Sequence, residues 1–200
     1  ETALYHANLG EMSRMAGRID AAIAAGRRAL ELDPDNPGAL SNLGIALFDQ
    51  GQFAEALGCY ERAIALQPDF ALAHSNRGNA LQRLKRFAEA EPAYRRALEL
   101  RPDFADGWNN LGTCLRELGR LDEAESAYGE ALERQPNNPD TLDNLALALK
   151  DLDRLEEAAE LLRRARAVDA ARDAFHTHYA AILLDQGKFD EAAAAVDRAL

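Results

Sequence analysis

The sequence predicts an all-α protein built from about six copies of one two-helix unit. Two observations support this prediction: a repeat period of 34 residues, and a composition in which Ala and Leu dominate while aromatic residues make up only 6% of 200 residues. Ala and Leu are strong helix formers, whereas strands favour β-branched and aromatic side chains. The composition therefore argues against a β-sandwich, a barrel or a parallel sheet.

The period is set by prolines that stand 34 residues apart, at Pro34, Pro68, Pro102 and Pro136. Phasing on these prolines gives five full units and a sixth that stops early: 3–36, 37–70, 71–104, 105–138, 139–172 and 173–200. Position 20 of the unit, which did not set the phase, is Ala every time: Ala22, Ala56, Ala90, Ala124, Ala158 and Ala192. Self-similarity at this period is the signature of a repeat architecture.

Each unit predicts two helices, most clearly in 105–138. Trp108, Leu111 and Leu115 follow the three-to-four residue spacing of one helix face. Gly119 stands where a left-handed residue would end the first helix, and Asp122 is expected to cap the second.

The second helix of each unit is expected to end at the repeated proline, because proline cannot continue a helix interior. Ala170 replaces this proline in unit 139–172. The second helix of that unit is therefore expected to run on or to turn less sharply.

This pattern resembles the tetratricopeptide repeat, whose signature is Trp-x2-Leu-Gly-x2-Tyr, then Ala-x3-Phe, then Pro. Unit 105–138 matches it at Trp108, Leu111, Gly112, Leu115, Ala124, Tyr128 and Pro136. The resemblance covers residues 3–200 and implies one right-handed α-solenoid of stacked antiparallel helix pairs, with first helices lining a concave groove. Solenoids need polar caps, and the last unit has none, so we expect a fragment of a longer protein.

Position 6 of the unit carries the pattern most suggestive of function. It reads Asn8, Asn42, Asn76, Asn110 and Asn144, and then His178. Positions 2, 6, 9 and 13 share one helix face, which is predicted to line the groove. A row of side-chain amides matches the donors and acceptors of a peptide backbone. The alternative is that these asparagines bond to the neighbouring helix or to water.

The predicted peptide-binding residues come from this face and the position beside it. They are Asn8, Asn42, Asn76, Asn79, Asn109, Asn110, Thr113, Glu117, Asn144 and Asp151. Acidic residues at positions 2 and 13 predict a groove whose C-terminal half favours an extended, neutral to basic peptide. The units also resemble the repeats of O-GlcNAc transferases, in strings such as Ser-Asn-Leu-Gly at 41–44, and that resemblance implies an asparagine ladder that holds a substrate backbone.

Several functions are excluded or disfavoured. The net charge of −11, from 23 Lys+Arg against 34 Asp+Glu, argues against a nucleic-acid partner. No apolar run approaches the roughly 20 residues that span a bilayer, and the arginine doublets of the second helices are interpreted as a solvated face. His6, His74 and His176 at position 4 are interpreted as packing residues, and no catalytic residue, metal site or cofactor is expected.

The sequence thus predicts a non-enzymatic, cytoplasmic scaffold that binds a protein or peptide in its groove. The alternative is the substrate-recruiting arm of a larger multidomain enzyme, such as a protein glycosyltransferase. Self-association of the solenoid is a third hypothesis.

Overall fold

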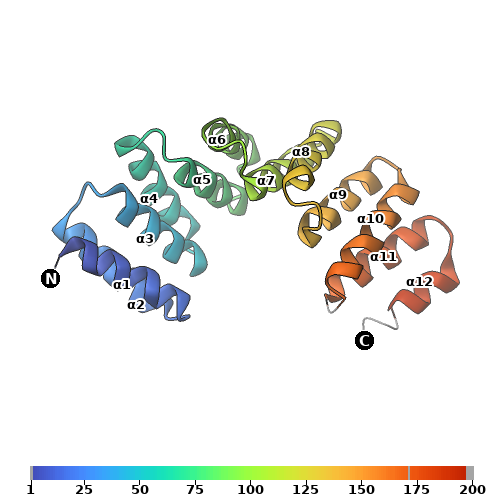
Figure 1. The fold of residues 1–200 in the computed structure, drawn as a ribbon, viewed down its shortest axis with the longest axis horizontal. Coiled ribbons are helices and arrows are strands. Elements are labelled where there is room, and N and C mark those ends of the chain that lie inside the picture. The colour runs from blue at the N-terminus through green and yellow to red at the C-terminus, as the bar shows by residue number, and fades with distance from the viewer. Residues whose placement is uncertain (1, 171, 197–200) are drawn as a thin grey trace. The chain divides into compact units, whose positions relative to one another are not determined.

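The structure is a computed structural model that describes residues 2–170 and 172–196, and within them it contains twelve α-helices and no strand (Figure 1). The all-α prediction is confirmed. The helices form two compact units, unit 1 (Glu1–Pro102) and unit 2 (Asp103–Leu200). Each unit holds three consecutive helix pairs.

The helix bounds follow the predicted repeats. Unit 1 contains α1 (Ala3–Met15), α2 (Ile19–Leu32), α3 (Pro37–Asp49), α4 (Phe53–Leu66), α5 (Ala71–Arg83) and α6 (Phe87–Leu100). Unit 2 contains α7 (Ala105–Glu117), α8 (Leu121–Arg134), α9 (Pro139–Asp151), α10 (Leu155–Val168), α11 (Asp173–Asp185) and α12 (Phe189–Val196). Within each repeat the first and second helices pack against each other, and each second helix within a unit also packs on the next first helix.

The turn inside each repeat depends on one residue with positive φ. Gly119 has φ of 75°, as the sequence predicts, but Lys85 and Asp153 adopt φ of 60° at the same position of their repeats. The predicted cap at Asp122 is wrong. Helix α8 begins at Leu121, and Asp122 lies in its first turn, where a negative charge favours the helix N-terminus.

The expectation that the helix before Ala170 runs on is also wrong. Helix α10 ends at Val168, and its C-cap backbone (φ −135°, ψ 84°) nearly matches that of α8 (φ −133°, ψ 79°), which ends before a proline. Packing fixes this end, because Phe175 of α11 is 1% exposed and packs against Ala165 of α10.

The core of the central repeats is a tyrosine from the second helix seated on a glycine of the first. Tyr60, Tyr94 and Tyr128 are at most 1% exposed. A Cβ built on Gly44, Gly78 or Gly112 would lie 2.6 Å from the ring of its tyrosine. The repeated glycine therefore gives the ring its space, which accounts for position 8 of the repeat.

Candidate functional site

The first helices of each unit form its inner side. In unit 1, α1 contacts α3 and α3 contacts α5, and in unit 2, α7 contacts α9 and α9 contacts α11. Among the described residues no such contact joins neighbouring second helices. The exposed side of the first helices is called the inner face of each unit below, and it carries the predicted asparagines.

On the inner face of unit 2, two position-6 side chains, those of Asn144 and His178, are bonded to the preceding repeat. Asn144 Nδ2 donates a hydrogen bond of 3.0 Å to Asn109 Oδ1. In the next repeat His178 Nδ1 lies 2.7 Å from Asp143 Oδ1. Each pair joins position 6 of one repeat to position 5 of the repeat before it, 35 residues away. This contact is the alternative that the sequence left open, and here it is realised.

Asp143 is nearly buried, with 9% of its surface exposed. Desolvation raises the pKa of this carboxyl, while the hydrogen bond and charge of His178 lower it. The contact therefore joins an imidazole to a carboxyl whose charged form is disfavoured by burial.

Among the described residues of unit 1, the equivalent inner-face contacts are absent. The structure records no hydrogen bond from the side chains of Asn8 or Asn42 to any described residue. Asn76 Nδ2 is buried without a hydrogen-bond partner among the described residues, and Ser41 Oγ has none either. Ser41 occupies the position-5 site that Asn109 and Asp143 occupy in unit 2, and its shorter side chain leaves Asn76 unpaired.

Position 9 serves the core. Tyr94 Oη lies 2.8 Å from Asn79 Oδ1, to which it donates a hydrogen bond. In unit 2, Tyr128 Oη lies 3.2 Å from Thr113 Oγ1, and burial raises the pKa of Tyr128 to about 12. The predicted binding residues Asn79 and Thr113 thus hold the buried tyrosines of their own repeats.

Position 13 is bonded to position 12 of the preceding repeat. Arg116 Nε lies 2.7 Å from Asp151 Oδ2, and Lys150 Nζ lies 3.0 Å from Asp185 Oδ2. Asp140, at position 2, is paired with Arg172. Much of the negative charge expected in the C-terminal half is therefore matched by cations on adjacent repeats.

Two further predicted residues lie on unit 2 in different surroundings: Glu117 is exposed and Asn110 is half-buried. In unit 1, the position-13 residue Arg83 places its guanidinium 4.3 Å from the ring centroid of Phe53 and 5.6 Å from that of Phe48. Sequence reasoning missed this cluster, although the 35-residue spacing from Phe48 to Arg83 matches that of the ion pairs.

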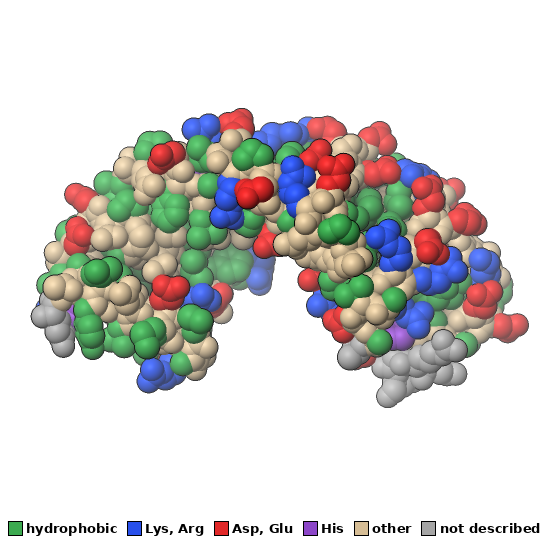
Figure 2. Space-filling model, viewed as in Figure 1, with side chains coloured by type: hydrophobic (Ala, Val, Ile, Leu, Met, Phe, Trp, Pro, Cys, Tyr) green, Lys and Arg blue, Asp and Glu red, His purple; other side chains and the backbone are tan. Residues whose placement is uncertain are grey.

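The arginine doublets of the second helices lie beside acidic side chains. Arg95 pairs with Glu91 at 2.9 Å and Arg96 with Glu99 at 2.9 Å. On the face shown in Figure 2, Lys/Arg and Asp/Glu side chains lie intermixed along both units. The interpretation of these doublets as a solvated, paired face is supported.

Two of the position-4 histidines, His74 and His176, bond to the loop before their helix, and His176 is buried as a packing residue. His74 Nε2 lies 2.9 Å from the Pro68 carbonyl oxygen, and buried His176 lies 3.3 Å from that of Ala170. Within the described part of the protein, no group of three or more His, Cys, Asp or Glu side chains could hold a metal ion. Among the same residues, no helix combines the length and the apolar character needed to cross a bilayer.

Paired helices of 13 and 14 residues, with a tyrosine seated on a glycine in the middle repeats, define a tetratricopeptide-type repeat protein. Sequence comparison then gives the particular family. The protein belongs to the family of the cilia and flagella-associated protein 70 C-terminal domain, which it matches over residues 3–200. Among proteins with curated descriptions, none matches this sequence.

Solved structures share the fold. PilF from Pseudomonas aeruginosa is 20% identical with a TM-score of 0.83, and the match covers 96% of this protein and 88% of PilF. MamA is 26% identical with a TM-score of 0.73, over 81% of this protein and 95% of MamA. YrrB, described as a TPR protein with an unusual peptide-binding site, is 25% identical with a TM-score of 0.69, over 84% of this protein and 87% of YrrB.

Proposed function

We propose that this protein is a non-enzymatic protein-interaction scaffold, and that the inner face of unit 1 binds the backbone of an extended peptide. The observation that carries the proposal is the contrast between the units. The amides of Asn8, Asn42 and Asn76 have no partner among the described residues, whereas Asn144 is bonded to Asn109. Of these three amides, only the Asn76 nitrogen is buried. A buried polar group without a partner is costly, so a ligand that supplies an acceptor to Asn76 would remove that cost.

The chemistry suits a peptide of varied sequence. A side-chain amide donates through its nitrogen and accepts through its oxygen, so it complements the C=O and N–H of a peptide unit. Asn42 and Asn76 stand at equivalent positions of α3 and α5, which are in contact. Neighbouring asparagines would therefore engage successive parts of one extended backbone, as in other modes of peptide recognition that use main-chain bonds.

The proposed peptide is neutral to basic. In unit 2, Asp106 and Glu117 are exposed acids on the first helix, while Asp140, Asp151 and Asp185 are paired with cations. These acids lie on unit 2 and not on the unit 1 face that is proposed to hold the peptide, so we expect charge to steer the peptide more than to hold it.

The test replaces Asn8, Asn42 and Asn76 together with Ala. A peptide is first selected from a random displayed library against the wild-type protein, and its affinity is then measured by calorimetry. We expect the triple variant to bind at least about tenfold more weakly, because charge-neutral hydrogen bonds contribute about 0.5–1.5 kcal/mol each.

The matched control is Asn144→Ala, which removes an asparagine already bonded within the protein. It should keep the wild-type affinity. A folded triple variant that binds as tightly as wild type, or a control that loses the same affinity, would contradict the proposal.

Self-association is a second candidate, favoured by the exposed side of α1. Tyr5 and Met12 are 51% and 66% exposed, whereas the matching residues of α3, Ala39 and Ala46, are 1% exposed. Light scattering over a concentration range tests it, and a Tyr5→Ser/Met12→Ser variant should shift any dimer towards monomer. A protein that stays monomeric at the highest concentration excludes it.

The alternative, a substrate-recruiting arm of a larger enzyme resembling O-GlcNAc transferase, uses the same inner face. This alternative differs from the scaffold proposal in requiring a catalytic domain in the same protein as the repeats. The full-length sequence of the parent protein tests this alternative, which is correct only if that sequence contains a glycosyltransferase domain.

A further inference from the structure

One repeat carries an arginine where the others carry an aliphatic residue. Position 28 reads Leu30, Ile64, Leu98 and Leu132 in the first four repeats. Leu98 is 5% exposed, and the other three pack against buried core clusters. The fifth repeat has Arg166 at this position. Burying a guanidinium where a neighbouring repeat buries a leucine costs free energy. An anionic or hydrogen-bonding partner for Arg166 would offset that cost.

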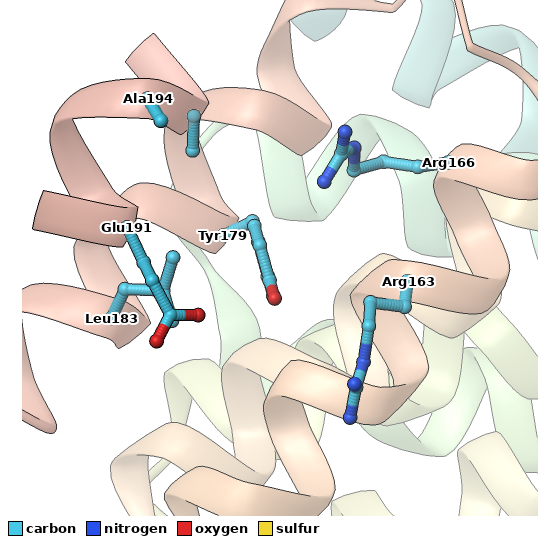
Figure 3. A pocket seen from close by; sticks show the side chains of 7 residues that line it. Arg163, Arg166, Tyr179, Leu183, Glu191 and Ala194 are labelled. Carbon is cyan, nitrogen blue, oxygen red and sulfur yellow. The ribbon is translucent and has the colours of Figure 1, made fainter. Parts of the chain in front are cut away.

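Arg166 borders a cavity of about 310 Å³ between α10, α11 and α12, a size within the range of small ligand pockets. In Figure 3, Arg163 and Arg166 project from α10, and Tyr179, Leu183 and Glu191 line the other walls. None of these residues stands at positions 2, 5, 6, 9 or 13 of its repeat. The cavity is therefore distinct from the inner-face asparagines.

The guanidinium of Arg166 lies against an aromatic ring, and no described residue forms an ion pair with it. Its central carbon lies 5.2 Å from the ring centroid of Tyr179, a cation–π distance. Arg166 Nε is buried and has no hydrogen-bond partner among the described residues. Arg163, by contrast, lies 2.7 Å from Glu160 Oε2 with more than half of its side chain exposed. Arg166, which lines the cavity, thus carries an N–H donor for which the described residues supply no acceptor.

The walls indicate which anion fits. A guanidinium binds a planar carboxylate through two parallel hydrogen bonds, while Leu183 and Ala195 offer apolar surface to a short aliphatic stem. Glu191 lines the same cavity, and its negative charge disfavours a doubly charged phosphate more than a singly charged carboxylate.

We infer that this cavity is a second binding site, which receives a single carboxylate of a peptide between Arg166, Arg163 and Tyr179. The carboxylate belongs either to an Asp or Glu side chain or to the free C-terminus of the peptide. This site goes beyond the proposed inner-face function and does not depend on it.

The test uses three peptides and the full 200-residue protein. The first is acetyl-Ala-Ala-Glu-Ala-Ala-amide, the second has Gln in place of Glu, and the third is acetyl-Ala-Ala-Ala-Ala with a free carboxylate. Titration is followed through the Arg Nε–Hε signals by NMR. We expect the Glu peptide, the free-carboxylate peptide or both to shift the Arg166 signal saturably, and the Gln peptide to shift it at least about tenfold less. Which of the two anionic peptides binds identifies the source of the carboxylate.

Arg166→Leu is the main variant, because leucine occupies position 28 in four other repeats of the sequence and should leave the fold intact. Its binding, followed through Tyr179 ring signals, should fall at least about tenfold. Arg96→Leu removes one exposed, paired arginine of unit 1 and controls for net charge, so it should bind as wild type.

The inference is overturned if the Gln peptide binds as well as the Glu peptide, if Arg166→Leu binds as tightly as wild type, or if inorganic phosphate shifts Arg166 while neither anionic peptide does. None of these outcomes bears on the proposed inner-face function, because the asparagine test uses variants of unit 1 and a different peptide.

Discussion

Units 1 and 2 share one repeat but join their first helices differently. In unit 2 the position-6 side chain bonds back to position 5 of the preceding repeat, through Asn144–Asn109 and His178–Asp143. In unit 1 the same asparagine is present, but position 5 of the preceding repeat is Ala7 or Ser41. The position-6 asparagine alone therefore does not determine its own role. The residue at position 5 of the preceding repeat decides whether the asparagine forms a contact within the protein or is free to bind a ligand.

The second row of contacts differs between the units at Arg83. Position 13 forms ion pairs in unit 2, at Asp151 and Asp185. In the same row of unit 1, Arg14 pairs with Asp49 at 3.3 Å, while Arg83 contacts aromatic rings. Exposed ion pairs contribute little to stability, so we expect the position-6 contacts to separate the units more than these pairs do.

The largest expected effect tests what the units have in common. Gly78→Ala in unit 1 and Gly112→Ala in unit 2 each place a Cβ 2.6 Å from a buried tyrosine ring. Overpacking of this kind costs about 1–3 kcal/mol of unfolding free energy, and we expect a similar loss in both units. Chemical denaturation measures it.

The matched control is Gly129→Ala on α8, whose added Cβ meets nothing within 4 Å. Because Ala is the better helix former, this change should raise the unfolding free energy by about 0.5–1 kcal/mol. If Gly112→Ala were as harmless as the control, the close tyrosine–glycine contact would be refuted.

The next effect separates the units. Asn144→Ala breaks a bond and leaves the Asn109 carbonyl unpaired, so it should cost about 1 kcal/mol. Asn76→Ala removes a buried amide nitrogen that has no partner among the described residues, and should be neutral or slightly stabilising. Urea denaturation measures the unfolding free energy of both variants. Equal losses would mean that Asn144 and Asn76 do not differ in their contribution to stability.

The repeat period predicted the helices because it compares each residue with its equivalent in another repeat. It located the left-handed turn at Gly119, but it did not show that the Tyr128 ring lies on Gly112. It could not assign the asparagines, since their partners lie 35 residues away and depend on a second residue type. Nor could it show that Asn79 and Thr113 hold buried tyrosines, because that contact depends on how the two helices of a repeat cross.

The residue with positive φ in the turn of each repeat allows a second comparison of the units, with a smaller expected effect on stability. Lys85 in unit 1 and Asp153 in unit 2 both hold φ of 60°, where the other repeats have glycine. Lys85→Gly should raise the unfolding free energy by about 0.5–1 kcal/mol, whereas Asp153→Gly should gain less because Asp tolerates this conformation better. Thermal melts resolve the difference, and the opposite order would show that side-chain contacts outweigh backbone strain.

The smallest expected effect is the pH dependence of the His178–Asp143 contact. The hydrogen bond from His178 lowers the pKa of Asp143 and so partly cancels the rise that desolvation causes. The pKa of Asp143 is raised above its ordinary 3.8, so the folded state holds this proton more tightly than the unfolded state does. Its contribution to stability is therefore fully present below pH 3.8 and is lost as the pH rises through the raised pKa. The ionisable groups that face it are His178, Asp140 and Arg172.

Asp143→Asn keeps an acceptor for His178 but cannot ionise. Relative to wild type, its unfolding free energy should increase as the pH rises from below 3.8 to above the raised pKa of Asp143, when both are measured by urea denaturation at each pH. Asp106→Asn, which removes an exposed carboxylate of the same unit, corrects for the change in net charge. A constant difference between Asp143→Asn and wild type across this range would mean that the contact does not titrate, and that the units differ only in their hydrogen bonds.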